Sequence, residues 1–432
     1  MAQFRKDTHQ FLGDGKTIFE VVMLADQYGD IVGAANPSGM AVDAFGRARV
    51  SNPLTLFDSY HRYDPNGKFD TANTGGGTYA FSANSAVFSM NVNTANNALC
   101  YRESKRVFAY QPGKSLQILQ TFVLNEGKTG LRQRVGYFDE RNGIFLELNG
   151  TNLSFVKRSN STDTPVDIEV NQTDWNIDPL DGTGPSGYTL DITKAQIMFI
   201  DIEWLGLGSV RCGFVIEGKL IHCHSFHHAN EVDGPYMTTA CLPIRLEIKN
   251  IADTLSNSTL KQVCSSVISE GGYELRGRPR SIGRPASNTF TLSTADTWYP
   301  IASIRLKADQ IDGIALPKSI SALAEGNNGR AKYALIAGGT LGGNTNFYSV
   351  ESGSPVEYNI KASTITGGSI LKQGVLGITN QASSSVNLDG DLFTYQLQRN
   401  GLTNTPEVLT LAMQSGTGGD TGIGSIDWEE VT

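Results

Sequence analysis

The chain has 432 residues, a formal net charge of −8 and a charged fraction of only 18%. Its 39% hydrophobic residues are enough for a substantial core, which excludes a disordered polymer, and the length suggests roughly two or three domains. The acidic balance disfavours nucleic acid as a partner, because phosphate binding needs clustered Lys and Arg side chains.

The cysteines and the apolar runs bear on where the protein is made. Five cysteines, spread along the chain without a Cys-x-x-Cys pair, indicate reduced and mostly buried thiols of a protein made in a cytoplasm. No stretch approaches the roughly 18 apolar residues that a membrane span needs, and residues 1–16 contain no uninterrupted apolar segment. We therefore expect neither membrane insertion nor export by a signal peptide.

Residues 1–50 contain only short strand candidates, at 17–24 and 30–32, which are divided by turn-forming residues. A segment of this kind is too small to bury a core of its own. It is predicted to be an N-terminal arm that docks onto another surface.

Residues 51–275 repeat strand-like runs that are separated by turn signals. Asn142–Gly143 and Asn149–Gly150 are pairs typical of tight hairpin turns, and the 47 glycines of the chain fit a fold rich in strands and turns. This region is predicted to be a central β-sandwich domain.

Residues 276–287 interrupt the strand pattern with four arginines and two prolines. They are predicted to be a stiff linker, and a basic contact strip for an acidic partner is the alternative. Residues 288–432 return to a strand pattern, although 316–324 could form a short helix that contains Pro317. The predicted fold is therefore all-β, with two antiparallel β-sandwich domains of jelly-roll or lectin-like type after the N-terminal arm.

The run from residue 197 to 230 combines a strand, a carboxylate pair and a hairpin around Glu217–Gly218. Asp201 and Glu203 alternate along one strand, so both carboxylates are predicted to face the same side, as a pair that a glycosidase could use for acid and base or nucleophile roles. Residues 199–203 resemble the E-x-D-x-E strand of the laminarinase-type glycoside hydrolases, which are lectin-like sandwiches. Phe199 stands where that family has its nucleophilic Glu, so the resemblance implies a sandwich without hydrolysis, and a solvated or salt-bridged strand face is the alternative.

His222, His224 and His228 would share one face of the second hairpin strand if it continues straight. Imidazoles at alternate strand positions can bind a transition metal, which makes these three residues the candidate metal ligands. Ordinary hydrogen-bonded histidines on a polar sheet face are the alternative. In a homotrimer, a three-fold axis would also bring His-x-His motifs of three chains together.

Several aromatic side chains could stack on sugar rings, although each is also a candidate core residue. No G-x-S-x-G elbow, P-loop, H-E-x-x-H motif or dinucleotide-binding unit is present, so the chain is predicted not to be an enzyme and to need no cofactor. The aromatic side chains that could stack on a sugar are Trp175, Trp204, Tyr236, Trp298 and Tyr348. Three of them, together with the carboxylate pair, are the predicted glycan contacts: Trp175, Asp201, Glu203, Trp298 and Tyr348.

Long segments within residues 1–275 resemble a family of virion structural proteins of tailed phages, notably those of cyanobacteria. The segments that carry the resemblance are 36–47, 56–59, 105–115, 131–138, 225–230 and 267–274. The resemblance implies a structural protein that is made in the host cytoplasm, is located in the virion and contacts other virion proteins.

The arrangement of the chain refines this expectation. A tail fibre or baseplate-associated protein would attach through its N-terminal region and could present its C-terminal domain to a host surface glycan. A capsid decoration or head-fibre protein is one alternative. A glycan-binding or glycan-degrading β-sandwich protein is another.

Overall fold

The computed structural model describes residues 52–65, 67–274, 277–326, 330–377, 383–387 and 395–431, and four short strands before them. The chain divides into two units, residues 1–52 and 53–432. In the first unit, β1 (His9–Phe11) pairs with β2 (Ile18–Glu20), and β3 (Leu24–Ala25) pairs with β4 (Ile31–Val32). The rest of the predicted arm lies outside the described residues, and its docking role stays a prediction.

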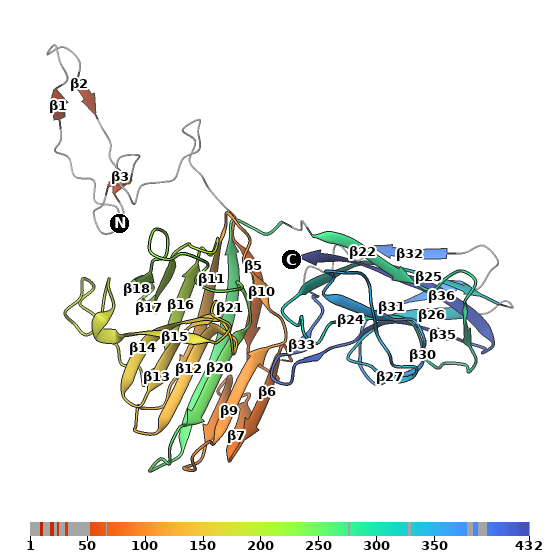
Figure 1. The fold of residues 1–432 in the computed structure, drawn as a ribbon, viewed down its shortest axis with the longest axis horizontal. Helices are drawn as coiled ribbons and strands as arrows, with labels where there is room; N and C mark the ends of the chain where they lie inside the picture. Colours follow the sequence, from red (N-terminus) through yellow and green to blue (C-terminus); the bar gives the residue numbers. More distant parts are fainter. Residues whose placement is uncertain are drawn as a thin grey trace. The chain divides into compact units, whose positions relative to one another are not determined.

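The second unit begins with two antiparallel sheets that we call the first sandwich (Figure 1). The eight-stranded sheet has the order β18 (Lys219–Phe226), β17 (Val210–Ile216), β16 (Gln196–Ile202), β11 (Ser115–Val123), β21 (Ser258–Glu270), β8 (Val87–Val92), β7 (Gly77–Ser82), with β5 (Leu54–Tyr60) also paired to β21. The seven-stranded sheet has the order β15 (Val166–Asn171), β14 (Asn152–Ser159), β13 (Gly143–Asn149), β12 (Leu131–Phe138), β20 (Ile244–Asn250), β9 (Leu99–Ser104), β6 (Phe69–Thr74).

Alternating burial along the central strands explains how these sheets form a sandwich. On β11, Leu116, Ile118 and Phe122 lie in the core together with the buried Gln120, while the residues that alternate with them are only half-buried. On β12, Val135 and Tyr137 belong to the same core. Because side chains of a strand alternate between its faces, each sheet turns one apolar face inward and buries it against the other sheet.

Residues after β21 form a second pair of antiparallel sheets, which we call the second sandwich. Its five-stranded sheet has the order β22 (Arg278–Gly283), β36 (Asp420–Val431), β25 (Ile314–Glu325), β32 (Ser383–Asn387), with β23 (Phe290–Leu292) also paired to β36. Its six-stranded sheet has the order β28 (Tyr348–Ser349), β29 (Val356–Asn359), β24 (Tyr299–Leu306), β35 (Leu409–Ser415), β26 (Arg330–Ala337), β31 (Ser369–Gly377).

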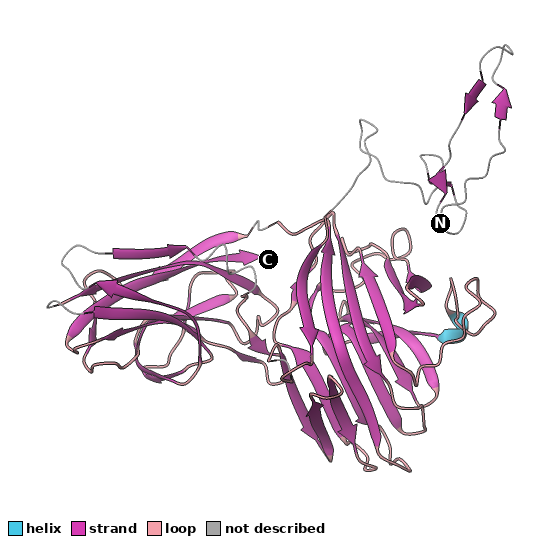
Figure 2. Cartoon of the chain, turned by 180° about the vertical axis from the view of Figure 1, so that it is seen from behind, coloured by secondary structure: helices cyan, strands magenta, loops and turns pink. Residues whose placement is uncertain are grey.

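The second sandwich has its own hydrophobic core. Burial alternates along the whole of β36, and Ile426 and Trp428 lie in a core that also contains Leu411 of β35. Short strand pairs complete the structure: β10 (Phe108–Ala109) with β19 (Cys241–Leu242), β27 (Thr340–Gly343) with β30 (Ala362–Thr366), and β33 (Arg399–Asn400) with β34 (Thr405–Pro406). The predicted all-β fold of antiparallel β-sandwiches is confirmed (Figure 2).

Two local predictions differ from the structure. The possible helix at 316–324 is wrong, because these residues belong to β25, where the ladder to β36 shifts register beside Pro317. In the predicted linker, residues 278–283 form β22, an edge strand on which Pro279 is tolerated. Among the described residues, the helical element is the 3₁₀ turn η1 (Gln172–Asp174), and no helix is long and apolar enough to span a membrane.

Candidate functional site

The predicted carboxylate pair sits where β16 ends. Asp201 lies on the strand opposite Arg211 of β17, and Glu203 follows the strand as an exposed residue whose N–H donates to the Ser209 carbonyl (3.1 Å). Burial raises the pKa of Asp201, and the Arg211 charge opposes this shift. Phe199 is buried and packs against the His222 ring with 5.1 Å between centroids. The position of a glycosidase nucleophile is therefore filled by a packed aromatic ring.

The predicted common face of His222, His224 and His228 is wrong, because the strand that carries them does not continue straight. The ladder between β17 and β18 shifts register between Cys212 and Gly213, so that Cys223 forms a bulge. His222 therefore packs outside the core on Phe199, while His224 is buried beside Phe226 (ring centroids 4.5 Å apart).

His228 lies beyond the end of β18 in a third environment. Its ring stacks on Tyr236 with 3.8 Å between centroids, and Nδ1 hydrogen-bonds to the Gly208 carbonyl (2.7 Å). Within the described part of the chain, no group of three or more His, Cys, Asp or Glu residues is arranged to hold a metal ion. The three histidines act here as packing and hydrogen-bonding residues.

The burial of His224 predicts a specific pH dependence of the free energy of unfolding. Burial lowers its pKa to about 4, so the unfolded chain takes up a proton near pH 6.5 while the folded chain stays neutral at this residue. We expect this residue to reduce the free energy of unfolding as the pH falls from 6.5 toward 4, by at most about 1.4 kcal/mol per pH unit. NMR titration of the imidazole measures the midpoint directly, and a midpoint near 6.5 would contradict the predicted burial effect.

The glycan-contact candidates do not form one site. Trp175 is only 4% exposed, packs in the first core against Phe155 and donates its indole N–H to the Val170 carbonyl (3.2 Å). Its prediction as a glycan contact is wrong, because its ring is covered. Trp298 is half-buried on a small apolar cluster of the second sandwich, and Tyr348 is exposed beside Tyr358. Asp201 and Glu203 lie on the first sandwich.

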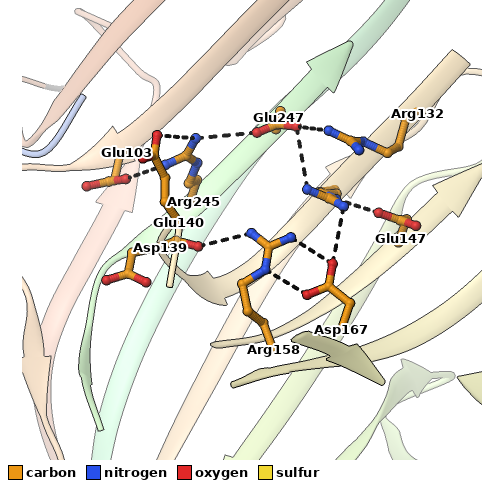
Figure 3. A network of polar contacts seen from close by, with 10 residues as sticks. Glu103, Arg132, Asp139, Glu140, Glu147, Arg158, Asp167, Arg245 and Glu247 are labelled. Carbon is orange, nitrogen blue, oxygen red and sulfur yellow. Dashed lines mark hydrogen bonds and ion pairs between the residues drawn. The ribbon is translucent and has the colours of Figure 1, made fainter. Parts of the chain in front are cut away.

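A network of ion pairs covers the outer face of the seven-stranded sheet (Figure 3). On β12, Arg134 alternates with the core residues Val135 and Tyr137, so its side chain lies on the face opposite the core. Direct cross-strand partners include Arg134 with Glu147, Arg134 with Glu247, Arg158 with Asp167, and Arg245 with Glu103. This network is not predictable from sequence spacing, because the paired residues come from six different strands.

The geometry of the network favours the charged form of two carboxylates, Asp167 and Glu247. Both oxygens of Asp167 accept hydrogen bonds of 2.7 Å from Arg158, and both oxygens of Glu247 contact guanidinium groups. Although burial opposes ionisation, Arg245 and the neighbouring arginines hold the pKa of Glu247 below its ordinary value. Arg158 likewise holds the pKa of Asp167 low against burial. These two groups are unsuited to act as general acids, and they link strands instead.

A cavity of about 840 Å³ lies between the two sandwiches, and we call it the junction pocket. One wall comes from the first sandwich and contains Ala109, Tyr110, Gln111, Pro112, Lys114, Trp204, Thr238, Thr239, Ala240, Cys241 and Glu274. The facing wall comes from the second sandwich and contains Gln310, Asp312, Gly313, Gly353, Pro355 and Val431.

Trp204 gives the first wall an aromatic surface, and Tyr110, which is 8% exposed, packs against it. Their rings pack edge to face with 6.5 Å between centroids. Trp204 belongs to a tight turn in which the Gly208 N–H donates to the Trp204 carbonyl (2.7 Å). A Cβ at Gly208 would lie 1.7 Å from the Glu203 carbonyl oxygen, so this turn requires glycine. The local backbone therefore fixes where the indole is presented.

One polar atom of this wall is unsatisfied. Nε1 of Trp204 is buried and has no hydrogen-bond partner among the described residues. A buried donor without a partner carries a desolvation cost of about 1–3 kcal/mol. Trp204 was among the aromatic candidates of the sequence, but its facing wall could not be predicted because it begins about 100 residues later.

Comparisons with known proteins identify no family for this chain. No protein-family model matches the chain, and none of the curated proteins matches it. Among solved structures, the chain is similar to arcelin-5, a lectin-like defense protein from Phaseolus vulgaris (10% identity, TM-score 0.31, 51% of this chain and 99% of that chain). It is also similar to the β-glucanase of Bacillus licheniformis (10% identity, TM-score 0.32, 51% and 98%) and to the carbohydrate recognition domain of Emp47p (11% identity, TM-score 0.32, 54% and 100%). At such TM-scores, these likenesses do not indicate what the chain binds.

Proposed function

We propose that this chain is a carbohydrate-binding protein without hydrolytic activity, and that the sugar occupies the junction pocket. The observation that carries the proposal is the aromatic wall of Trp204 and Tyr110, with a buried indole N–H that lacks a partner. A cavity of about 840 Å³ is within the usual size range of small-molecule sites.

The chemistry of the pocket suits a polyhydroxylated ring. A sugar presents an apolar C–H face that stacks on aromatic rings, and hydroxyl groups that both donate and accept hydrogen bonds. The indole N–H of Trp204 needs an acceptor, while Gln310 and Asp312 of the facing wall offer polar groups to the hydroxyls. Binding without hydrolysis is supported by Phe199, which fills the position of the nucleophile with a buried ring.

The test is calorimetric titration of the full chain with oligosaccharides, repeated with Trp204→Phe. This change keeps an aromatic ring and removes the N–H, so we expect about tenfold weaker binding. Trp298→Phe is the matched control, because Trp298 is also half-buried but lies outside the pocket. Absence of binding to any oligosaccharide, or equal affinity of Trp204→Phe and wild type, would overturn the proposal.

A second proposal concerns where the protein works. The resemblance of segments within residues 1–275 to virion structural proteins supports a component of a tailed phage particle, a tail fibre or baseplate-associated protein in preference to a capsid decoration or head-fibre protein. Carbohydrate binding would then serve contact with a host surface. Mass spectrometry of purified particles from which the tails have been separated tests this assignment. Detection in the tail fraction supports it, and absence from both fractions contradicts it.

A further inference from the structure

We infer that Arg399 is a positioning residue for the junction pocket. By pairing with Glu103, it holds the two sandwiches together and so fixes the arrangement of the pocket walls. The part of this inference that concerns a ligand rests on the proposed carbohydrate binding. Arg399 does not line the pocket, so its effect on a ligand would pass through the arrangement of the walls.

Arg399 is anchored in the second sandwich and reaches into the first. Leu397, two residues earlier, lies in the second core, and its N–H donates to the Ala315 carbonyl (2.9 Å). Nη1 of Arg399 donates to Oε1 of Glu103 on β9, and both residues are buried. The backbone N–H of Arg399 also donates to the Lys105 carbonyl (3.1 Å). The contact between the sandwiches thus combines a buried ion pair with a backbone hydrogen bond.

Further contacts cross the junction. Val107 of the first sandwich packs with Ile314 and Leu316 of the second, and the Cys241 thiol donates to the Asp312 carbonyl (3.0 Å). Cys241 and Asp312 lie on opposite walls of the pocket. Because Arg399 adds a buried ion pair to these contacts, its loss is expected to loosen the walls.

Glu103 remains paired when Arg399 is removed. Its second oxygen, Oε2, accepts a hydrogen bond of 3.1 Å from Arg245 on β20, within the seven-stranded sheet. Replacement of Arg399 therefore leaves the network of the first sandwich connected. The expected damage is confined to the junction and does not unfold either core.

Gly401 offers a way to disturb the contact without a change of charge. A Cβ at this position would lie 1.8 Å from Nη1 of Arg399 and 2.0 Å from Oε1 of Glu103. Its backbone is not among the positive-φ positions, so alanine is tolerated by the local conformation. Gly401→Ala must therefore displace the paired side chains.

The experiment compares Arg399→Ala, Arg399→Lys and Gly401→Ala by hydrogen exchange and by oligosaccharide titration. We expect Arg399→Ala and Gly401→Ala to speed amide exchange in residues 397–401 and to weaken binding about tenfold, a usual size for coupling at a distance. Arg399→Lys should restore part of both. Arg305→Ala is the matched control, because Arg305 pairs with Glu357 (2.6 Å) inside the second sandwich. It should leave exchange in residues 397–401 and binding unchanged.

The two readouts separate the two proposals. If wild type binds no oligosaccharide, the proposed function fails, and the exchange measurements still test whether Arg399 joins the sandwiches. Wild-type exchange in both Arg399→Ala and Gly401→Ala would overturn the inference. Faster exchange with unchanged affinity would also overturn it, because the contact would then not position the pocket.

Discussion

Replacing Arg134 by alanine is expected to lower the free energy of unfolding by about 3–5 kcal/mol, because it leaves the buried carboxylate of Glu147 without its partner. Arg134 donates to Glu147, which is 2% exposed, and also lies near Glu247 (3.9 Å) and Asp167 (3.6 Å). Its guanidinium also packs over Phe145, 5.1 Å from the ring centroid. Chemical denaturation monitored by circular dichroism measures the loss.

The control for this prediction is Arg305→Ala, which removes a more exposed ion pair on the second sandwich. Such pairs contribute about 0–1 kcal/mol, so the two variants should differ several-fold in their effect. A loss below about 1 kcal/mol for Arg134→Ala would contradict the view that the network holds the strands of the sheet together.

The second large effect is loss of stability in acid. Glu247 and Asp167 have pKa values below those of the unfolded chain, because guanidinium groups outweigh the opposing effect of burial. A carboxyl with a lowered folded pKa stabilises the fold above its unfolded pKa, and this contribution disappears as the pH falls through the folded pKa. The ordinary values are 4.5 and 3.8, so the loss from these two residues begins below about pH 4.5.

Urea unfolding at several values between pH 7 and pH 2.5 measures this dependence. Glu247→Gln cannot titrate at residue 247, so its stability should fall less steeply with acid than that of wild type. Equal slopes for wild type and Glu247→Gln would show that the acid response arises elsewhere. The contribution of His224 is distinguishable, because it begins near pH 6.5 and the network acts only below about pH 4.5.

The sequence predicted those features that depend on neighbouring residues. The hairpin at Glu217–Gly218 is confirmed, with positive φ at both residues (52° and 76°), because the turn chemistry is local. The all-β class follows from alternation along single strands. By contrast, the bulge at Cys223 left no signal in the spacing of His222 and His224, and it alone separates their faces.

The site depends on long-range pairing, which a single sequence does not reveal. Glu103 and Arg245 are 142 positions apart and become direct partners only through the register of β9 and β20. Trp175 and Trp204 are the same type of residue and the sequence does not distinguish them, but Trp175 packs in the core and Trp204 lines a cavity. Only the arrangement of the second sandwich decides which tryptophan has a facing wall.

The account rests on the junction pocket as a carbohydrate site, and a crystal structure of the full chain with a bound oligosaccharide tests this most directly. We predict a sugar ring between the two walls, with a hydroxyl oxygen within hydrogen-bond distance of Nε1 of Trp204. A sugar bound elsewhere, such as beside Tyr348 on the second sandwich, would contradict the account.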